Sequence, residues 1–223
     1  IPMDVSKASY DNNSTEYEDF PAGEHYLQLS ATERDLVEMV CDNFDNVIVL
    51  YNGANQFELG FVEEYEQIKA ALWCPGTGNR GFNALGQILS GQLNPSGKTP
   101  DTFLYDLETA PWWNNGEKID YTNLADMAVE GMNAGVAQIF APSFTNYVEG
   151  IYVGYKFYET AAAEGLIDYD SIVQYPFGYG LSYTSFRQEM GPLQEADGAV
   201  TVEVTVTNTG AVAGKDVVGL YYN

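Results

Sequence analysis

The chain of 223 residues carries 32 aspartate and glutamate residues against nine lysine and arginine residues, a formal net charge of −23 at pH 7. A surface of this sign repels nucleic acid and anionic membranes, so the composition argues against both as partners. Hydrophobic residues make up 45% of the chain, enough for a globular core, and no apolar run is long enough to span a bilayer. The acidic surface indicates either a need for solubility or a cationic partner.

Cysteine and histidine are too few to predict a disulfide framework or a metal centre. Cys41 falls on a predicted helix and Cys74 at the end of an apolar strand, so two separate buried thiols are expected. The one histidine, His25, has no spaced set of Cys and His residues around it. A Cys–His nucleophile pair is the alternative, but no family signature accompanies it. We expect neither a metal nor a cofactor.

The first predicted helix follows a long polar segment. Residues 1–29 are turn-prone and rich in tyrosine, which predicts a loop, and loops of this length in compact proteins are often functional. Ser30 and Glu33 form a capping-box pattern, which places a helix start here. Apolar residues then recur at helical spacing and predict one apolar face: Leu36, Val37, Val40 and Phe44. The start of the chain lacks the basic and apolar regions of a signal peptide, which leaves the compartment open, with a bacterial cytoplasm favoured over export.

Two apolar strands come next and predict an α/β sheet. The runs Val47 to Tyr51 and Ile68 to Cys74 are apolar throughout, as expected of parallel strands that are covered on both faces. The loop Gly76-Thr-Gly78 then leads into a second helix, whose apolar residues are Phe82, Leu85, Ile88 and Leu89. A glycine loop before a helix also suggests a dinucleotide site, but the full glycine fingerprint and its acidic ribose partner are missing.

The later segments predict a loop and then strands. Trp112-Trp113 indicates a surface loop whose rings either stack on a sugar or wedge the structure, and wedging is favoured because tryptophan rings dominate packing contacts. After Ala199, four valines alternate with polar residues and predict a half-buried strand: Val200, Val202, Val204 and Val206. A turn at Asn208-Thr-Gly210 precedes a further predicted strand from Val217 to Tyr222.

The segment Tyr175-Pro-Phe-Gly-Tyr-Gly-Leu-Ser-Tyr-Thr-Ser-Phe186 is the most informative part of the chain. Its glycines permit positive φ and close backbone approach, and its aromatic rings suit a wedge between domains. It resembles the segment through which family 3 glycoside hydrolases pass from an α/β sandwich into a fibronectin-III-like domain. Further segments agree in order, from the strand at Val47 through Asn94-Pro-Ser-Gly-Lys-Thr-Pro-Asp-Thr-Phe103 to Glu149-Gly-Ile-Tyr-Val-Gly-Tyr-Lys-Phe-Tyr158. The chain departs from the family pattern at Asn79-Arg80 and Phe82.

The resemblance implies the fold and the division into domains. Residues 1–186 are expected to form the later half of a layered α/β sandwich, and residues 187–223 the first strands of a truncated β-sandwich. The wedge segment should be buried between the sandwich and the strand near Val200. A chain of this kind would be part of a longer enzyme, whose remaining domains are its expected partners.

The resemblance also implies a retaining β-glycosidase that acts on terminal β-linked glucose or a similar sugar. Such enzymes use a nucleophilic carboxylate and a carboxyl acid/base. The resemblance places the nucleophilic Asp on a barrel that this chain lacks, and the acid/base Glu upstream of Ile1, because residues 1–4 look like those that follow it in one branch of the family. We therefore expect no catalytic residue within the chain, with Glu24 as the fallback acid.

Four residues are candidates for contacts with an oligosaccharide or β-glucoside substrate: Asp4, Asp11, Asn79 and Arg80. The first two lie in the N-terminal loop, and the other two follow the second strand, where ligands of α/β sheets gather. An ion pair with a surface carboxylate is the simpler role for Arg80. The alternative to an enzyme is a non-catalytic carbohydrate-binding or scaffold module that uses the Trp112-Trp113 loop.

Overall fold

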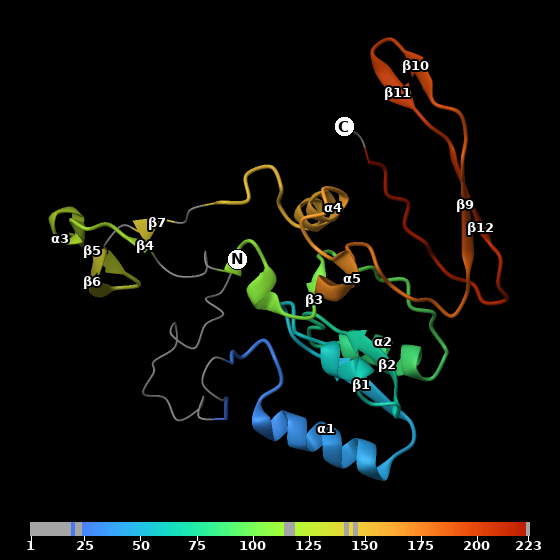
Figure 1. The fold of residues 1–223 in the computed structure, drawn as a ribbon, viewed down its shortest axis with the longest axis horizontal. Coiled ribbons are helices and arrows are strands. Elements are labelled where there is room, and N and C mark those ends of the chain that lie inside the picture. Colours follow the sequence, from blue (N-terminus) through green and yellow to red (C-terminus); the bar gives the residue numbers. More distant parts are fainter. Residues whose placement is uncertain (1–18, 21–23, 114–118, 141–142, 145–146, 222–223) are drawn as a thin grey trace.

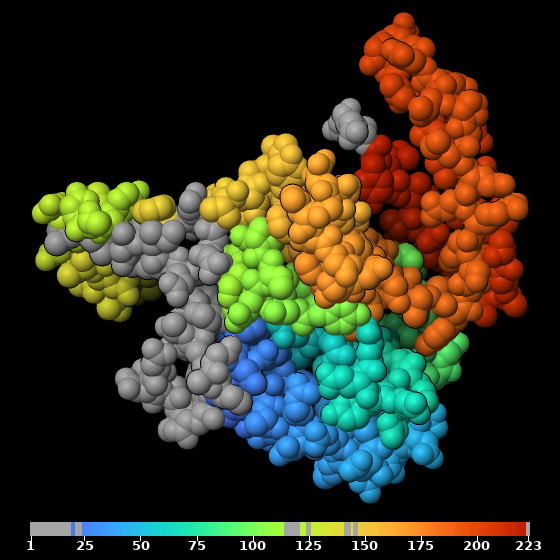
Figure 2. Space-filling view, in the orientation of Figure 1, coloured from blue at the N-terminus to red at the C-terminus, as the bar shows by residue number. Residues whose placement is uncertain are grey.

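The computed structural model describes residues 19–20, 24–113, 119–140, 143–144 and 147–221. Three parts are visible in Figure 1: a central body, a small lobe of residues 119–144 that projects from one side, and a long two-stranded arm near the C-terminus. Figure 2 shows that the lobe and the arm both stand clear of the body. In the described part of the chain, no helix combines the length and the apolar character needed to cross a membrane.

The first helix, α1 (Ala31–Asn43), begins with the predicted capping box. The Ser30 hydroxyl accepts a hydrogen bond from Glu33 N, and Glu33 Oε2 accepts one from Ser30 N. Asp19 reinforces this start because its carboxylate accepts bonds from the backbone and the hydroxyl of Thr32. The predicted apolar face is only partly covered: Cys41 is buried, whereas Leu36 and Phe44 are exposed.

The strands β1 (Val47–Tyr51) and β2 (Ile68–Trp73) pair in parallel, as predicted. Burial on both faces was the wrong expectation for this chain. Along β1 the side chains alternate between half-buried and exposed, and Ile48 and Leu50 remain 50% and 42% exposed. The reason is that the two strands form a sheet by themselves, so that within the described residues only one face packs fully against the core.

A second strand pair contributes side chains to both clusters of the core. β3 (Phe103–Leu104) and β8 (Val173–Tyr175) run antiparallel, and each contributes side chains to the core. One buried cluster holds Leu27, Leu104, Leu107, Ala110, Tyr158 and Val173. The other holds Leu59, Phe61 and Phe103, against which Val49, Tyr51 and Trp73 pack. Short 3-10 helices, η3 (Gly60–Glu63) and η4 (Leu107–Thr109), and the helices α4 (Tyr155–Ala163) and α5 (Tyr169–Ile172) complete the body.

The second predicted helix is confirmed as α2 (Gly81–Leu89). Gly76 and Gly78 in the preceding loop have φ of +52° and +57°, a left-handed conformation that glycine adopts at little cost. The apolar face of α2 is not buried, and Phe82 is 55% exposed.

The projecting lobe had no predicted elements. Its chain enters and leaves through the antiparallel pair β4 (Ile119–Asp120) and β7 (Ser143–Phe144). Between them lie α3 (Leu124–Met127) and a hairpin of β5 (Val129–Asn133) and β6 (Val136–Phe140). Ala134 and Gly135 have φ of +50° and +83° at the hairpin turn, the signs that a type I′ turn requires.

The Tyr175–Phe186 segment docks on the loop of residues 94–99. Thr99 N donates to Tyr179 O at 2.7 Å, and Gly178 N donates to Thr99 O at 2.8 Å. Gly180 approaches so closely that a side chain there would collide with Gly97 O. The predicted burial of the aromatic rings is wrong for three of them, because Phe177, Tyr179 and Tyr183 remain 38–49% exposed. The segment docks mainly through hydrogen bonds to its backbone. The three rings are only partly covered: Tyr183 Oη donates to Ile88 O, Phe177 stacks on Tyr155, and Tyr179 stacks on Tyr175.

The arm consists of β9 (Phe186–Met190) paired with β12 (Val204–Asn208), and β10 (Gln194–Ala196) paired with β11 (Ala199–Thr201). The single strand predicted over Val200–Val206 is therefore split into β11 and β12, and a hydrogen bond from Gly191 N to Glu203 O marks the break. The predicted strand from Val217 is not formed over residues 217–221, where Val217 O accepts from the Gln188 side chain instead of from a neighbouring strand. The domain boundary at residues 186 and 187 stays a prediction.

Candidate functional site

The carboxyl ends of β1 and β2 lie side by side, and side chains join the loops that follow them. Asn52 Nδ2 donates to Cys74 O at 2.6 Å, and Trp73 Nε1 donates to Gly53 O at 2.8 Å. Cys74 N extends the ladder by donating to Tyr51 O. Ligands of open α/β sheets bind at this kind of edge, so it is the first candidate site.

Asn79 and Arg80 both lie on the loop between β2 and α2, at this edge, and both are exposed. The loop is held by hydrogen bonds of its own, from Gly81 N to Thr77 O and from Asn83 N to Arg80 O. Both side chains are thus free of the core and available to a ligand. The other two candidates, Asp4 and Asp11, lie outside the described residues.

A second polar site, which sequence reasoning missed, surrounds His25. The ring is only 3% exposed, and its Nε2 lies 3.2 Å from Glu58 Oε1. Its Nδ1 accepts a hydrogen bond from Leu27 N at 3.2 Å, so the hydrogen bonding assigns the proton of the neutral ring to Nε2, which donates to Glu58. The indole of Trp113 covers the ring, with the two centroids 4.7 Å apart.

The Glu58 carboxylate joins three segments of the chain. Besides His25, its Oε1 accepts a hydrogen bond from Leu107 N at 2.8 Å. The side-chain amide nitrogen of Gln28 donates to Glu58 Oε2 at 3.0 Å, in the amide orientation that satisfies its hydrogen-bonding neighbours. Each donor removes part of the cost of burying the carboxylate. No short motif in the sequence signals this arrangement, because the three partners come together only through the tertiary fold.

The predicted fallback acid, Glu24, adjoins His25 and is half buried. The nearby Glu16 and Glu18 lie outside the described residues. A role for Glu24 as acid/base stays a prediction.

Trp112 and Trp113 lie half buried against the larger core cluster, with their rings 6.2 Å apart and tilted by 48°. Both rings pack on core side chains, and the ring of Trp113 also packs on His25. The arrangement favours a structural role in packing for the two tryptophans over a role in stacking on a sugar.

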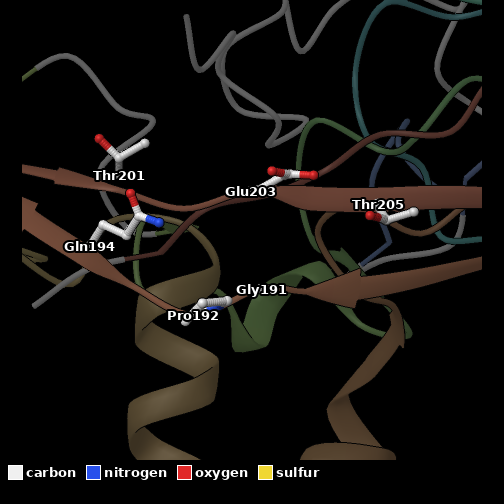
Figure 3. Close-up of a pocket in the computed structure, with 6 residues that line it drawn as sticks. All are labelled: Gly191, Pro192, Gln194, Thr201, Glu203 and Thr205. Carbon is white, nitrogen blue, oxygen red and sulfur yellow. The ribbon is translucent and has the colours of Figure 1, made fainter.

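Figure 3 shows a hollow at the break in the arm, with a volume of about 290 Å³. Its lining comes from both sides of the arm: Gly191, Pro192, Gln194, Thr201, Glu203 and Thr205. Glu203 is the one carboxylate among them. Because retaining glycoside hydrolysis needs two carboxyl groups about 5–5.5 Å apart, this lining does not make a hydrolytic site.

Cys41 is buried as predicted, whereas Cys74, which was also expected to be buried, is only half buried; both are free thiols. Burial raises the pKa of the Cys74 thiol, which keeps it protonated and weakens it as a nucleophile. Throughout the part of the chain that the structure describes, no group of three or more His, Cys, Asp and Glu side chains is arranged to hold a metal ion.

The helices, the parallel strand pair and the flanking antiparallel strands define a partial α/β sandwich. Residues 5–155 match the family model described as the glycosyl hydrolase family 3 C-terminal domain. The chain therefore belongs to glycosyl hydrolase family 3, a family of glycosidases, and it contains the C-terminal domain of that family.

Known relatives are similar along most of the chain. The chain is 34% identical over 220 residues to "Beta-glucosidase A" of Butyrivibrio fibrisolvens, covering 92% of this chain and 23% of that protein. It is 30% identical over 214 residues to "Beta-glucosidase BoGH3A" of Bacteroides ovatus, covering 94% of this chain and 25% of that protein. The chain thus spans about a quarter of the length of these curated relatives.

Solved structures agree with the fold. A beta-glucosidase from Paenibacillus barengoltzii superposes with a TM-score of 0.62 at 31% identity, over 82% of this chain and 17% of that one. Beta-glucosidase 3B from Thermotoga neapolitana, solved with glycerol, gives a TM-score of 0.62 at 30% identity over 84% of this chain and 23% of that one. The predicted family and fold class are confirmed.

Proposed function

We propose that the chain is part of a retaining β-glycosidase that hydrolyses terminal, non-reducing β-linked glucose or a similar sugar. The observation that carries the proposal is the 34% identity to a beta-glucosidase over 220 residues, nearly the whole chain. The edge at the ends of β1 and β2 adds support, because it presents exposed amide and guanidinium groups where an α/β sheet binds ligands.

The proposed mechanism divides the chemistry between this chain and the rest of the enzyme. A nucleophilic aspartate on a barrel domain attacks the anomeric carbon while an acid/base glutamate protonates the departing glycosidic oxygen. Water, deprotonated by the same glutamate, then releases the sugar from the nucleophile. We place the glutamate on the segment that precedes Ile1, and we assign Asp4, Asp11, Asn79 and Arg80 to the rim of the site. No cofactor takes part in these steps.

The stereochemistry of hydrolysis tests the proposal. The complete enzyme, supplied with an aryl β-glucoside in an NMR tube, should release β-glucose first, with the α-anomer growing in later by mutarotation. Initial release of the α-anomer would show an inverting enzyme, and absence of hydrolysis for a panel of β-glycosides would refute the function.

The rim assignment has its own test in the same enzyme. Replacing Asn79 or Arg80 by Ala should raise KM more than it lowers kcat, because a contact made equally in the ground and transition states affects binding alone. Arg34→Ala is a matched control, since Arg34 is an exposed arginine on α1 whose ion pair is with Glu64. Kinetic constants equal to those of the unsubstituted enzyme would remove both residues from the rim.

A further inference from the structure

The hairpin of the projecting lobe is exposed on both of its faces. Among the described residues of the lobe, none is buried, and all five side chains of β6 are exposed, with Ile139 at 71%. The structure gives β5 and β6 only each other as partners, so each strand keeps one edge without a neighbouring strand in the described part of the chain. Because a two-stranded hairpin is at best marginally stable in water, further strands would stabilise it.

The free edge of β6 is more open to a further strand than the free edge of β5. Natural proteins place charges, prolines and bulges on edge strands to prevent pairing. β6 reads Val-Ala-Gln-Ile-Phe and pairs with β5 without a bulge, so it has none of the three. β5 contains Glu130 and Gly131, and both residues disfavour the addition of a strand.

The register of the hairpin identifies the backbone groups at the free edge of β6. Asn133 and Val136 flank the two-residue turn and form a hydrogen-bonded pair. Because such pairs alternate along an antiparallel ladder, the N–H and C=O groups of Ala137 and Ile139 point away from β5. These two residues supply the donors and acceptors that a further strand would meet.

We propose that β6 pairs antiparallel with β6 of a second copy of this chain, about a two-fold axis that passes through the position of Gln138. In this register Ala137 of each copy exchanges both backbone hydrogen bonds with Ile139 of the other. Val136 lies opposite Phe140 of the other copy, so apolar side chains meet and no charge opposes a like charge. Two marginal hairpins thereby become one four-stranded sheet.

The charge of the chain favours this contact over other contacts between copies. A net charge of −23 makes two copies repel each other over most of their surface. The lobe stands clear of the body in Figure 2, so two copies that meet at β6 keep their bodies apart. Salt screens the remaining repulsion, because exposed charges interact little beyond about 8 Å at physiological ionic strength. A cationic partner, by contrast, would find no carboxylate on β6.

Two proline variants test which edge makes the contact. Sedimentation velocity of the 223-residue chain over a range of concentrations should show a monomer–dimer equilibrium. Ala137→Pro removes one outward N–H from each copy and keeps the bonds to β5, and edge strands tolerate proline. The loss of two backbone hydrogen bonds should weaken the dimer by about 30-fold. Met132→Pro is the matched control, because Met132 pairs with Ala137 in the hairpin and its N–H faces the other edge.

Cysteine variants test the register. In the proposed dimer, residue 138 lies opposite its own counterpart, with the Cα atoms about 4.5 Å apart, a separation that a disulfide can span. Gln138→Cys should therefore form a covalent dimer under mild oxidation. Val136→Cys is the control: it lies on the same face and is 61% exposed, but its counterpart is about 13 Å away along the strands. The unsubstituted chain, with the thiols of Cys41 and Cys74, gives the background.

The outcomes decide the proposal without reference to glycosidase activity. A dimer that Ala137→Pro weakens and Met132→Pro does not, cross-linked through Gln138→Cys alone, supports it. A chain that stays monomeric at every concentration overturns it and leaves the edge to a different partner. A dimer that both proline variants weaken equally, or that Val136→Cys cross-links as well as Gln138→Cys does, overturns it too. Circular dichroism establishes folding, and if Ala137→Pro does not fold, the two cysteine variants decide alone.

Discussion

At the scale of single residues, side chains at the centre of the body are far more deeply buried than side chains on the open face of the sheet. Leu107 is fully buried, because η4 turns it into the larger cluster while its own N–H is held by Glu58. Leu50 lies on the open face of β1 and keeps 42% of its surface exposed. Two leucines of the same chain therefore contribute unequally to the free energy of folding.

Leu107→Ala should lower the free energy of unfolding of residues 1–223 by about 2–5 kcal/mol, since it removes methyl groups from a packed core and leaves a cavity. Leu50→Ala should cost about 1 kcal/mol, because much of that side chain already contacts water. Urea titrations of both variants measure the difference. Equal losses would show that β1 is covered in solution.

The ionisation of two tyrosines should make the folded chain less stable at high pH. Burial, with the negative charge of Glu63 added, raises the pKa of Tyr175 to about 12, and burial with a hydrogen bond to Glu159 raises that of Tyr169 to about 12. Between pH 10 and pH 12 the unfolded chain releases these protons while the folded chain keeps them. The free energy of unfolding should therefore fall across this interval as the pH rises.

Replacing Tyr175 by Phe removes one of the two groups and should flatten the fall between pH 10 and pH 12. Tyr152→Phe, at an exposed position, serves as the control. Denaturant titrations at several pH values provide the measurement. A slope unchanged by Tyr175→Phe would mean that this hydroxyl ionises as readily in the folded chain as in the unfolded one.

Residue-level prediction from the sequence succeeded for local patterns and failed for distant partners. The capping box of Ser30 and Glu33 depends on groups three positions apart, and it formed as expected. His25 looked isolated, because its partners Glu58 and Trp113 approach only after the body has packed. Ordinary glutamates are numerous in this acidic chain, so nothing in the sequence singles out Glu58.

At the scale of elements, the loop of residues 94–99 is the main connection between the body and the Tyr175–Phe186 segment. Asn94 makes three bonds: its Oδ1 accepts from Ser182 Oγ and Tyr183 N, and its Nδ2 donates to Ala213 O. Lys98 Nζ donates to Gly180 O at 2.6 Å and lies 3.8 Å from Asp216. Side chains from one short loop thereby fix both the wedge segment and the chain after β12.

Asn94→Ala should loosen this connection, since it removes all three hydrogen bonds at once. Limited proteolysis of residues 1–223 should then cut faster between residues 180 and 186. Asn83→Ala, at an exposed position on α2, is the control and should leave that rate unchanged. Identical digestion patterns for the two variants would show that backbone bonds alone hold the segment.

Helices and strands could be predicted from the sequence where the periodic pattern of apolar residues is strong. α1, α2, β1 and β2 all have clear apolar patterns, and each is found where the sequence places it. The pair of β3 and β8 could not be predicted, because two or three residues carry no period and the pairing joins distant parts of the chain. The split between β11 and β12 also escaped prediction, since the valines alternate without interruption through the break.

At the scale of the whole molecule, the chain contains a domain rather than a complete catalytic centre under the proposed mechanism. Residues 1–223 alone should therefore not hydrolyse a chromogenic β-glucoside, because catalytic groups act as a unit and removing one costs orders of magnitude in rate. A spectrophotometric assay of the purified chain measures this. Turnover that Glu24→Gln abolishes would instead place the acid/base inside the chain and contradict the position ahead of Ile1.

The lobe of residues 119–144 leaves the body and returns to it through one short ladder, in which Ile119 pairs with Phe144 and Asp120 with Ser143. Its two ends are therefore neighbours in space. For this reason, inserting or deleting the whole lobe would leave the path of the remaining chain unchanged. Evolution can lengthen, shorten or replace this lobe independently of the sandwich. For protein engineering, the same property makes the β5–β6 turn a natural place to graft a peptide tag.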